Sequence, residues 1–120
     1  MVKWLKSNEL VDYDYAVNFM ESRASDIASN QKQERIWVVG LPPLYTGGAS
    51  AKEKDLLDKN SFPVYRTRRG GKFTYHGPGQ RVAYVMLDLN KRERDVRSFV
   101  EFLERWIIAT LQEFNIEGEI

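Results

Sequence analysis

The chain has 120 residues, of which 42% are hydrophobic and 29% charged, and its formal net charge at pH 7 is +1. This composition excludes an intrinsically disordered chain and is typical of one soluble globular domain with a modest core. The charge near zero gives no global reason to expect nucleic acid or a membrane as partner, and no apolar run is long enough to span a bilayer.

The first part of the sequence predicts a strand, a helix and a second strand. Residues 2–5 alternate weakly between apolar and polar side chains and are expected to form an edge strand. From residue 12 to about residue 31, apolar side chains recur every three or four positions, which predicts a helix. Asp12 or Asp14 is expected to cap its start. Arg35–Val39 is rich in β-branched residues and predicts a buried strand.

The second part predicts two strands and two helices around two loops. Leu41–Ser50 is rich in glycine and proline and is expected to be a loop, and Lys52–Asp58 a short helix. Val64–Thr67 predicts a strand. Val82–Leu89 is apolar on both faces, which predicts a central strand covered on both sides. Asp95–Phe114 carries a long apolar stripe at helical spacing and predicts the second long helix.

This order of elements predicts an α/β protein of the α+β layered type, in which helices pack on a mixed β-sheet. The sheet is expected to be incomplete at its C-terminal side, since the chain stops at residues 116–120, where a further strand is expected to begin.

The most informative stretch is residues 69–80, RGGKFTYHGPGQ, which lies between two predicted strands. It holds four glycines, a proline and the only histidine of the chain within twelve residues. Glycine allows a backbone to approach a ligand closely, so a binding loop is favoured over a plain connection. Gly77-Pro78-Gly79 predicts a tight turn.

Five basic residues lie within sixteen positions of this region: Arg66, Arg68, Arg69, Lys72 and Arg81. They are consistent either with a solvated basic loop or with recognition of an anion or an acidic partner. His76 is either a structural hydrogen-bonding group or a base that titrates near neutral pH. No spacing suggests a metal site, and the dinucleotide-binding and P-loop patterns are absent.

RGGKFTYHGPGQ resembles the signature of the octanoyl-(acyl-carrier-protein):protein N-octanoyltransferases, or lipoyl(octanoyl) transferases, of the biotin/lipoate protein ligase superfamily. Similarity extends to Pro42-Pro43 with Tyr45-Thr46-Gly47-Gly48, and to residues 83–89. The resemblance implies the fold of the biotin/lipoate protein ligase catalytic domain. It also implies a substrate-binding set formed by Arg69, Gly70, Gly71, Lys72, Phe73, Thr74, Tyr75 and His76.

The activity implied is transfer of an octanoyl group from octanoyl-acyl carrier protein to a lysine of a lipoyl domain, through a cysteine thioester. Lipoyl domains of 2-oxoacid dehydrogenases and the glycine cleavage H protein are the acceptors implied, with no cofactor and no metal. The chain has no cysteine, so no catalytic residue is assigned within it. The cysteine and its lysine partner are expected beyond Ile120.

Residues 1–120 are therefore expected to be the N-terminal part of one octanoyltransferase catalytic domain, inactive alone, either truncated or a natural half-domain kept for binding. Two other functions stay open: an ATP-dependent lipoate or biotin protein ligase, and a non-catalytic module that binds acyl carrier protein or nucleic acid. The first ten residues lack the apolar segment of a signal peptide, so a cytoplasmic location is expected.

Overall fold

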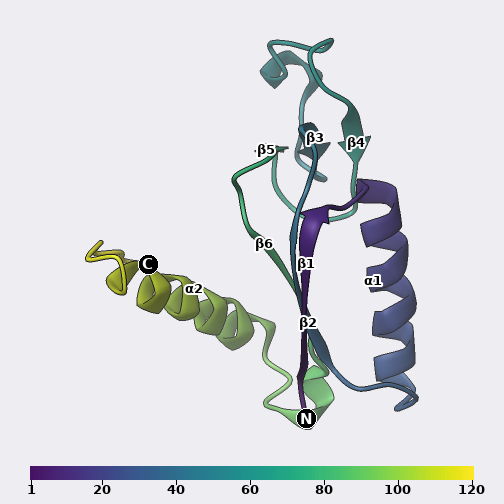
Figure 1. The fold of residues 1–120 in the computed structure, drawn as a ribbon, viewed down its shortest axis with the longest axis vertical. Coiled ribbons are helices and arrows are strands. Elements are labelled where there is room, and N and C mark those ends of the chain that lie inside the picture. Colours follow the sequence, from purple (N-terminus) through teal and green to yellow (C-terminus); the bar gives the residue numbers. More distant parts are fainter. The chain divides into compact units, whose positions relative to one another are not determined.

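The computed structural model describes residues 1–120, which form two compact units, Met1–Leu87 and Asp88–Ile120. The first unit contains a helix, six strands and a short 3₁₀ turn (Figure 1): β1 (Lys3–Leu10), α1 (Tyr13–Ala28), β2 (Arg35–Gly40), β3 (Leu44–Gly47), η1 (Glu53–Asp55), β4 (Val64–Arg66), β5 (Phe73–His76) and β6 (Val82–Met86). The second unit contains a 3₁₀ turn and a helix: η2 (Leu89–Lys91) and α2 (Val96–Gln112).

Three long strands form the first sheet, in the order β1-β2-β6. β1 runs parallel to β2, and β6 runs antiparallel to it, so Trp37 lies opposite Leu5 on one side and Tyr84 on the other. The predicted edge strand and the predicted strand at residues 35–39 are both confirmed. The prediction of a central strand at residues 82–89 is wrong, because β2 is central and β6 lies at an edge. Apolar residues on both faces indicate burial, but they do not determine which strands pair.

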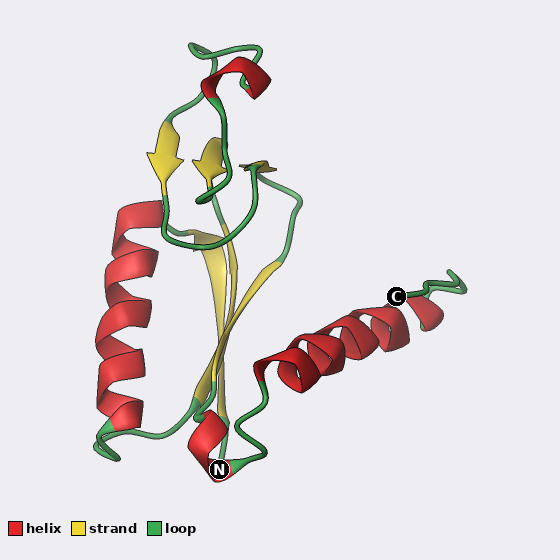
Figure 2. Ribbon diagram, turned by 180° about the vertical axis from the view of Figure 1, so that it is seen from behind, coloured by secondary structure: helices red, strands yellow, loops and turns green.

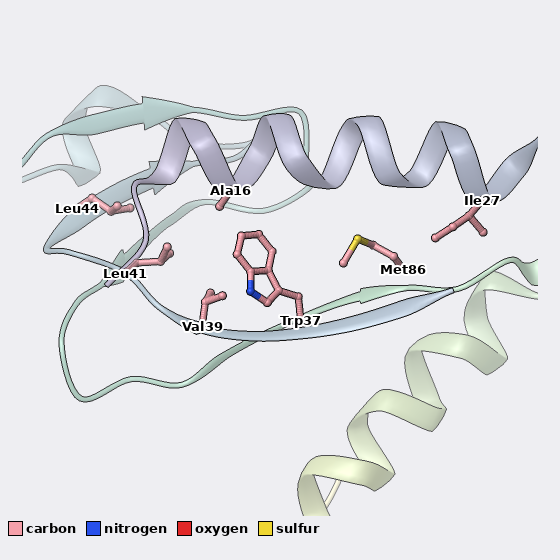
Figure 3. Close-up of a cluster of buried hydrophobic side chains, with 7 residues drawn as sticks. All are labelled: Ala16, Ile27, Trp37, Val39, Leu41, Leu44 and Met86. Atoms are coloured by element: carbon pink, nitrogen blue, oxygen red, sulfur yellow. The ribbon is translucent and has the colours of Figure 1, made fainter. Parts of the chain in front are cut away.

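Helix α1 covers one face of this sheet and encloses the core of the first unit. The carboxylate of Asp12 accepts a hydrogen bond from the backbone N–H of Tyr15 at 3.1 Å, so Asp12 is the cap and Asp14 is not. Ala16 points from the helix toward the indole of Trp37 on β2, and Ile27 lies further along the helix on the side of Met86 (Figure 3). The buried hydrophobic cluster consists of Ala16, Ile27, Trp37, Val39, Leu41, Leu44 and Met86.

A second, smaller sheet follows in the order β4-β3-β5, again with one parallel and one antiparallel pair (Figure 2). The mixed character of the predicted sheet is confirmed, but it consists of two sheets. Two loop predictions are corrected: residues 41–50 contain β3, and residues 69–80 contain β5. Both strands have four residues within segments rich in glycine and proline, and they exist because each pairs with a distant segment. The predicted helix at residues 52–58 is only the turn η1.

The second unit is dominated by α2, which confirms the predicted helix. Asp95 caps it by accepting hydrogen bonds from the backbone N–H groups of Arg97 and Ser98. Asn115 ends it with a left-handed φ of 60°, and the N–H of Ile116 donates to the carbonyl of Leu111 at 3.0 Å. No residue of α2 is buried. Neither helix of the chain is long and apolar enough to cross a membrane.

The core cluster predicts a large difference between two leucine truncations. Leu41 is 1% exposed and Leu57 is 94% exposed. Leu41→Ala is expected to lower the free energy of unfolding by about 2–5 kcal/mol, because it removes buried methyl groups and leaves a cavity. The matched control Leu57→Ala should change it by less than about 0.5 kcal/mol. Urea denaturation of both variants tests this, and equal losses would contradict the described core.

Candidate functional site

The eight predicted substrate-binding residues fall into two structural parts. Residues 69–72 form a turn that carries the first four, and β5 carries the other four. The tight turn predicted after them is confirmed: the N–H of Gln80 donates to the carbonyl of Gly77 at 3.2 Å. Gly79 has a φ of 92°, which a side chain would disfavour, and it follows Pro78 as in a type II turn. This turn leads the chain from β5 into β6.

The turn at residues 69–72 is fastened to the glycine-rich segment that follows β3. Three consecutive N–H groups donate to its carbonyls: Gly48 to Lys72 (3.1 Å), Ala49 to Arg69 (2.8 Å) and Ser50 to Gly71 (3.0 Å). The two backbones are so close that a Cβ on Gly48 would lie 2.5 Å from the oxygen of Gly71 and 2.6 Å from that of Gly70. The absence of a side chain at Gly48 is therefore required for this contact.

The guanidinium of Arg69 also joins the two segments. Its Nη2 donates to the carbonyl oxygen of Thr46 (2.8 Å), the hydroxyl of Thr46 (2.7 Å), the carbonyl of Lys72 (3.2 Å) and the hydroxyl of Thr74 (3.3 Å), while Nη1 donates to the carbonyl of Gly70 (2.9 Å). The guanidinium therefore has all of these hydrogen-bond partners within the protein itself. Of the other basic residues predicted to recognise an anion, Arg66 pairs with Glu53, whereas Arg68, Lys72 and Arg81 are exposed and have no hydrogen bond or ion pair to protein.

Thr46 connects Arg69 to His76. Its side chain is buried, with 2% of the residue exposed, and its Oγ1 lies 3.5 Å from Nε2 of His76. Because the hydroxyl already accepts from Arg69, its single hydrogen is free to point to Nε2. Sequence reasoning did not select Thr46 as a site residue. The sequence feature that marks Thr46 is the string Tyr45-Thr46-Gly47-Gly48. The string alone does not place Thr46 beside His76, because that position results from the pairing of β3 with β5.

Two effects keep the imidazole of His76 neutral. Burial lowers its pKa below the usual 6.5, and the positive charge of Arg69 lowers it further. A side-chain hydrogen bond with Gln80 acts in the opposite direction and is the weakest of the three effects. At neutral pH the ring therefore has one N–H donor and one acceptor nitrogen to offer.

The register of the small sheet separates the residues of β5 onto two faces. Directly paired residues lie on the same face, and β3 pairs with β5 as Thr46 with Thr74 and Tyr45 with Tyr75. The Thr46 face therefore carries Thr74 and His76, together with the guanidinium of Arg69. The opposite face carries Phe73 and Tyr75. The structure thus brings three predicted substrate residues together around Thr46 and places the two aromatic ones elsewhere.

This arrangement suits binding and orientation of a substrate more than a complete reaction. Around Thr46 it offers a neutral imidazole and two hydroxyl groups in fixed positions. No thiol is present, and no group of three or more His, Cys, Asp or Glu side chains is placed to hold a metal ion.

The contact between the two glycine-rich segments predicts that alanine destabilises the protein at one glycine and not at another. Gly48→Ala forces the backbones apart and is expected to lower the free energy of unfolding by about 1–3 kcal/mol. Gly70→Ala is the matched control, because an added Cβ there meets no atom within 4 Å. Chemical denaturation and amide NMR spectra of residues 46–51 provide the readout. Equal effects of the two substitutions would contradict the close contact.

The charge of Arg69 predicts a change in the titration of His76. Arg69→Met is expected to raise the pKa of His76 toward its ordinary value, because the positive charge that disfavours the imidazolium is removed. Arg68→Met removes a neighbouring charge that does not shift His76 and is the control. Histidine ring NMR signals followed through a pH titration measure both variants. An unchanged or lower pKa in Arg69→Met would refute the coupling.

Comparison with known proteins places the chain among related sequences. The profile of the lipoyl protein ligase A/B catalytic domain matches residues 12–120. A protein of Jannaschia sp. (strain CCS1) named Octanoyltransferase is 57% identical over 120 residues, which cover 100% of this chain and 56% of that protein. Octanoyltransferases of Paracoccus denitrificans and Bartonella henselae are 57% and 52% identical, with 55% and 48% of their lengths covered.

The chain thus spans about half the length of the curated relatives it matches. The matched profile begins at the cap of α1 and covers every later element, and of the strands it leaves out only β1. This family has the biotin/lipoate ligase fold, and the structure of the chain accordingly contains mixed sheets and two helices. The chain belongs to the lipoyl protein ligase A/B catalytic domain family.

Proposed function

We propose that this chain is the substrate-holding part of an octanoyltransferase. The enzyme transfers an octanoyl group from octanoyl-acyl carrier protein to a lysine of a lipoyl domain, with no cofactor. The match of the whole chain to proteins named Octanoyltransferase supports this assignment. Residues 1–120 are then the N-terminal part of a single catalytic domain.

The arrangement around Thr46 is the structural observation that carries the proposal. Arg69 fixes the turn at residues 69–72, and Gly70 leaves open space where a side chain would stand. A substrate chain can lie directly against this backbone, as a binding loop requires. His76, held neutral beside Thr46, forms a polar wall of the same site. The other members of the predicted set, including Lys72 and Thr74, complete the turn and the strand.

The transfer itself needs a nucleophile that these 120 residues lack. In the proposed reaction a cysteine thiolate attacks the carbonyl carbon of the octanoyl thioester, and the thiol of the carrier leaves. The lysine amine then attacks the new thioester, the amide bond forms, and the cysteine sulfur leaves after the amine gives up a proton. We assign the cysteine and its lysine partner to the part of the relatives' length that this chain does not match.

The proposed partners follow from this reaction. The donor is octanoyl-acyl carrier protein, and the acceptors are the lipoyl domains of 2-oxoacid dehydrogenases and the glycine cleavage H protein. Exposed Arg68 and Lys72 give the turn two free cations that suit an acidic partner. We expect the reaction to take place in the cytoplasm.

A second candidate is an ATP-dependent lipoate protein ligase, because the matched profile is that of lipoyl protein ligases A and B. Such a ligase binds an acyl-adenylate, whereas the proposed transferase does not require one. Saturable binding of lipoyl-AMP to the chain, in preference to an octanoyl thioester, would favour the ligase.

The absence of cysteine predicts that the chain alone is inactive. Purified chain mixed with octanoyl-acyl carrier protein and a lipoyl domain should produce no octanoylated domain by intact-mass spectrometry. The octanoyltransferase of Paracoccus denitrificans serves as the positive control. Octanoylation by the 120-residue chain would show that a cysteine is not needed.

A chimera tests the proposed function directly. The matched segment of the Paracoccus denitrificans protein is replaced by this chain, and the product is expected to transfer octanoate. His76→Ala in the chimera should lower kcat/KM by about tenfold, the equivalent of one hydrogen bond of ~1.4 kcal/mol. A folded chimera without octanoyl transfer would refute the proposal. Unchanged kcat/KM in the variant would remove His76 from the site.

A further inference from the structure

Two half-buried arginines lie where the chain passes from α1 into β2, at the end of the first sheet away from the small sheet (Figure 1). Arg23 belongs to α1, and Arg35 is the first residue of β2. Thr46 lies in β3, which follows the other end of β2, so none of the residues around Thr46 and His76 takes part here. The two arginines are therefore separate from the site described above.

The same short stretch of structure holds both guanidinium groups. Arg23 donates from Nε (3.0 Å) and Nη2 (2.7 Å) to the carbonyl of Gln33, two residues before Arg35. The guanidinium carbon of Arg35 lies 5.5 Å from the ring centroid of Phe19, which is one helical turn before Arg23 on the same face of α1. Both groups thus lie between one turn of α1 and the start of β2, in positions that these contacts fix.

Neither guanidinium has a carboxylate partner in the protein. Asp26, one turn further along α1, pairs with Lys32 at 3.3 Å, and Glu34 is buried with an interaction of its own with other residues. Lys3 lies directly opposite Arg35 in the pairing of β1 with β2, which adds a third positive charge. Like charges in such positions are unfavourable unless a counter-charge lies between them. This end of the sheet therefore has an excess of positive charge that the protein does not neutralise.

Arg35 also has hydrogen-bond donors that the protein leaves unused. Its Nε is the one buried side-chain nitrogen or oxygen without a hydrogen-bond partner. Its two terminal nitrogens have no partner in the protein either, and they are not buried. Burial lowers the pKa of Arg35, and the positive charge of Arg23 lowers it further, so the two cations disfavour each other. An anion that accepts hydrogen bonds from both groups would remove this repulsion.

We propose that Arg23 and Arg35 together bind the phosphate group of a small anionic ligand. The oxygens of a phosphate have a tetrahedral arrangement, so they can accept hydrogen bonds from both guanidiniums at once. One arginine fork, in contrast, already satisfies a planar carboxylate. A phosphate monoester carries a charge of about −1.5 to −2 at neutral pH, which matches the two arginines, and Lys3 provides a further cation at the edge of the sheet.

This binding site goes beyond the proposed transfer of an octanoyl group and does not depend on it. Its residues come from α1 and the start of β2, and none of them is a predicted substrate-binding residue. Phosphate binding is therefore expected in the 120-residue chain itself, which lacks the cysteine that the transfer requires. An inactive chimera would refute the proposed function and leave this result intact.

Titration of the 120-residue chain with small anions tests the proposal. The probes are inorganic phosphate, glycerol 3-phosphate and acetate, each at neutral pH, with sodium chloride added to keep the ionic strength constant. Amide shifts of Phe19, Arg23 and Arg35 in ¹H–¹⁵N spectra report occupancy. Both phosphates are expected to give saturable shifts, with a Kd at least about fivefold lower than that of acetate. The tighter of the two phosphates identifies whether the group arrives as the free ion or as a monoester.

Three variants separate this site from general electrostatics. Arg23→Met and Arg35→Met are each expected to raise the Kd of inorganic phosphate by about fivefold or more, because each removes one guanidinium and keeps an apolar stem. Arg81→Met is the matched control, since Arg81 is exposed, has no partner and lies at the other end of the sheet, just before β6. It should leave the Kd unchanged.

Three results would each overturn the proposal. The first is the absence of saturable shifts with either phosphate, and the second is equal affinity for acetate. The third is an equal effect of Arg81→Met and of the two other substitutions, whether large or absent. Amide signals of the core residues Trp37 and Val39 show that a variant is folded. Because Arg23 and Arg35 are replaced separately, one folded variant of the two is enough to decide.

Discussion

The small sheet and its site depend on the contact between two glycine-rich segments far apart in the sequence. Gly48, Ala49 and Ser50 donate their N–H groups to the turn at residues 69–72, and Arg69 returns several hydrogen bonds to the same region. Each bond alone contributes about 1 kcal/mol, and together they give every carbonyl group of residues 69–72 a hydrogen-bond donor. The turn is therefore ordered before any substrate is present.

This contact also assigns different roles to charged residues that look equivalent in the sequence. Arg69 is occupied within the protein, so its charge acts at short range and depresses the pKa of His76. Lys72 of the same turn and Arg68, which precedes it, stay free at the surface. Residues 68–72 thus combine one structural cation with two that can meet a partner. Pairing of β3 with β5 adds a second division, since it directs Thr74 and His76 to one face and Phe73 and Tyr75 to the other.

Sequence patterns predicted elements best where the signal is local. Helices α1 and α2 and strand β2 were predicted closely, because periodic apolar residues and a capping aspartate lie within each element or beside it. β3 and β5 were missed, because four residues between glycines and prolines resemble a loop until their partners are known. The edge position of β6 was missed for a related reason: its apolar residues indicate burial but not which strand lies beside it.

The sequence by itself determined the layered α/β class, the two helices, the family of the chain and the absence of a thiol nucleophile. These properties depend on composition, local periodicity and one uninterrupted motif, all of which can be read without contacts. Only the tertiary structure decided that Thr46 lies between Arg69 and His76, and that the motif is divided between two faces of a sheet. Those relations arise from hydrogen bonds between segments about twenty to thirty residues apart, and no local pattern specifies them.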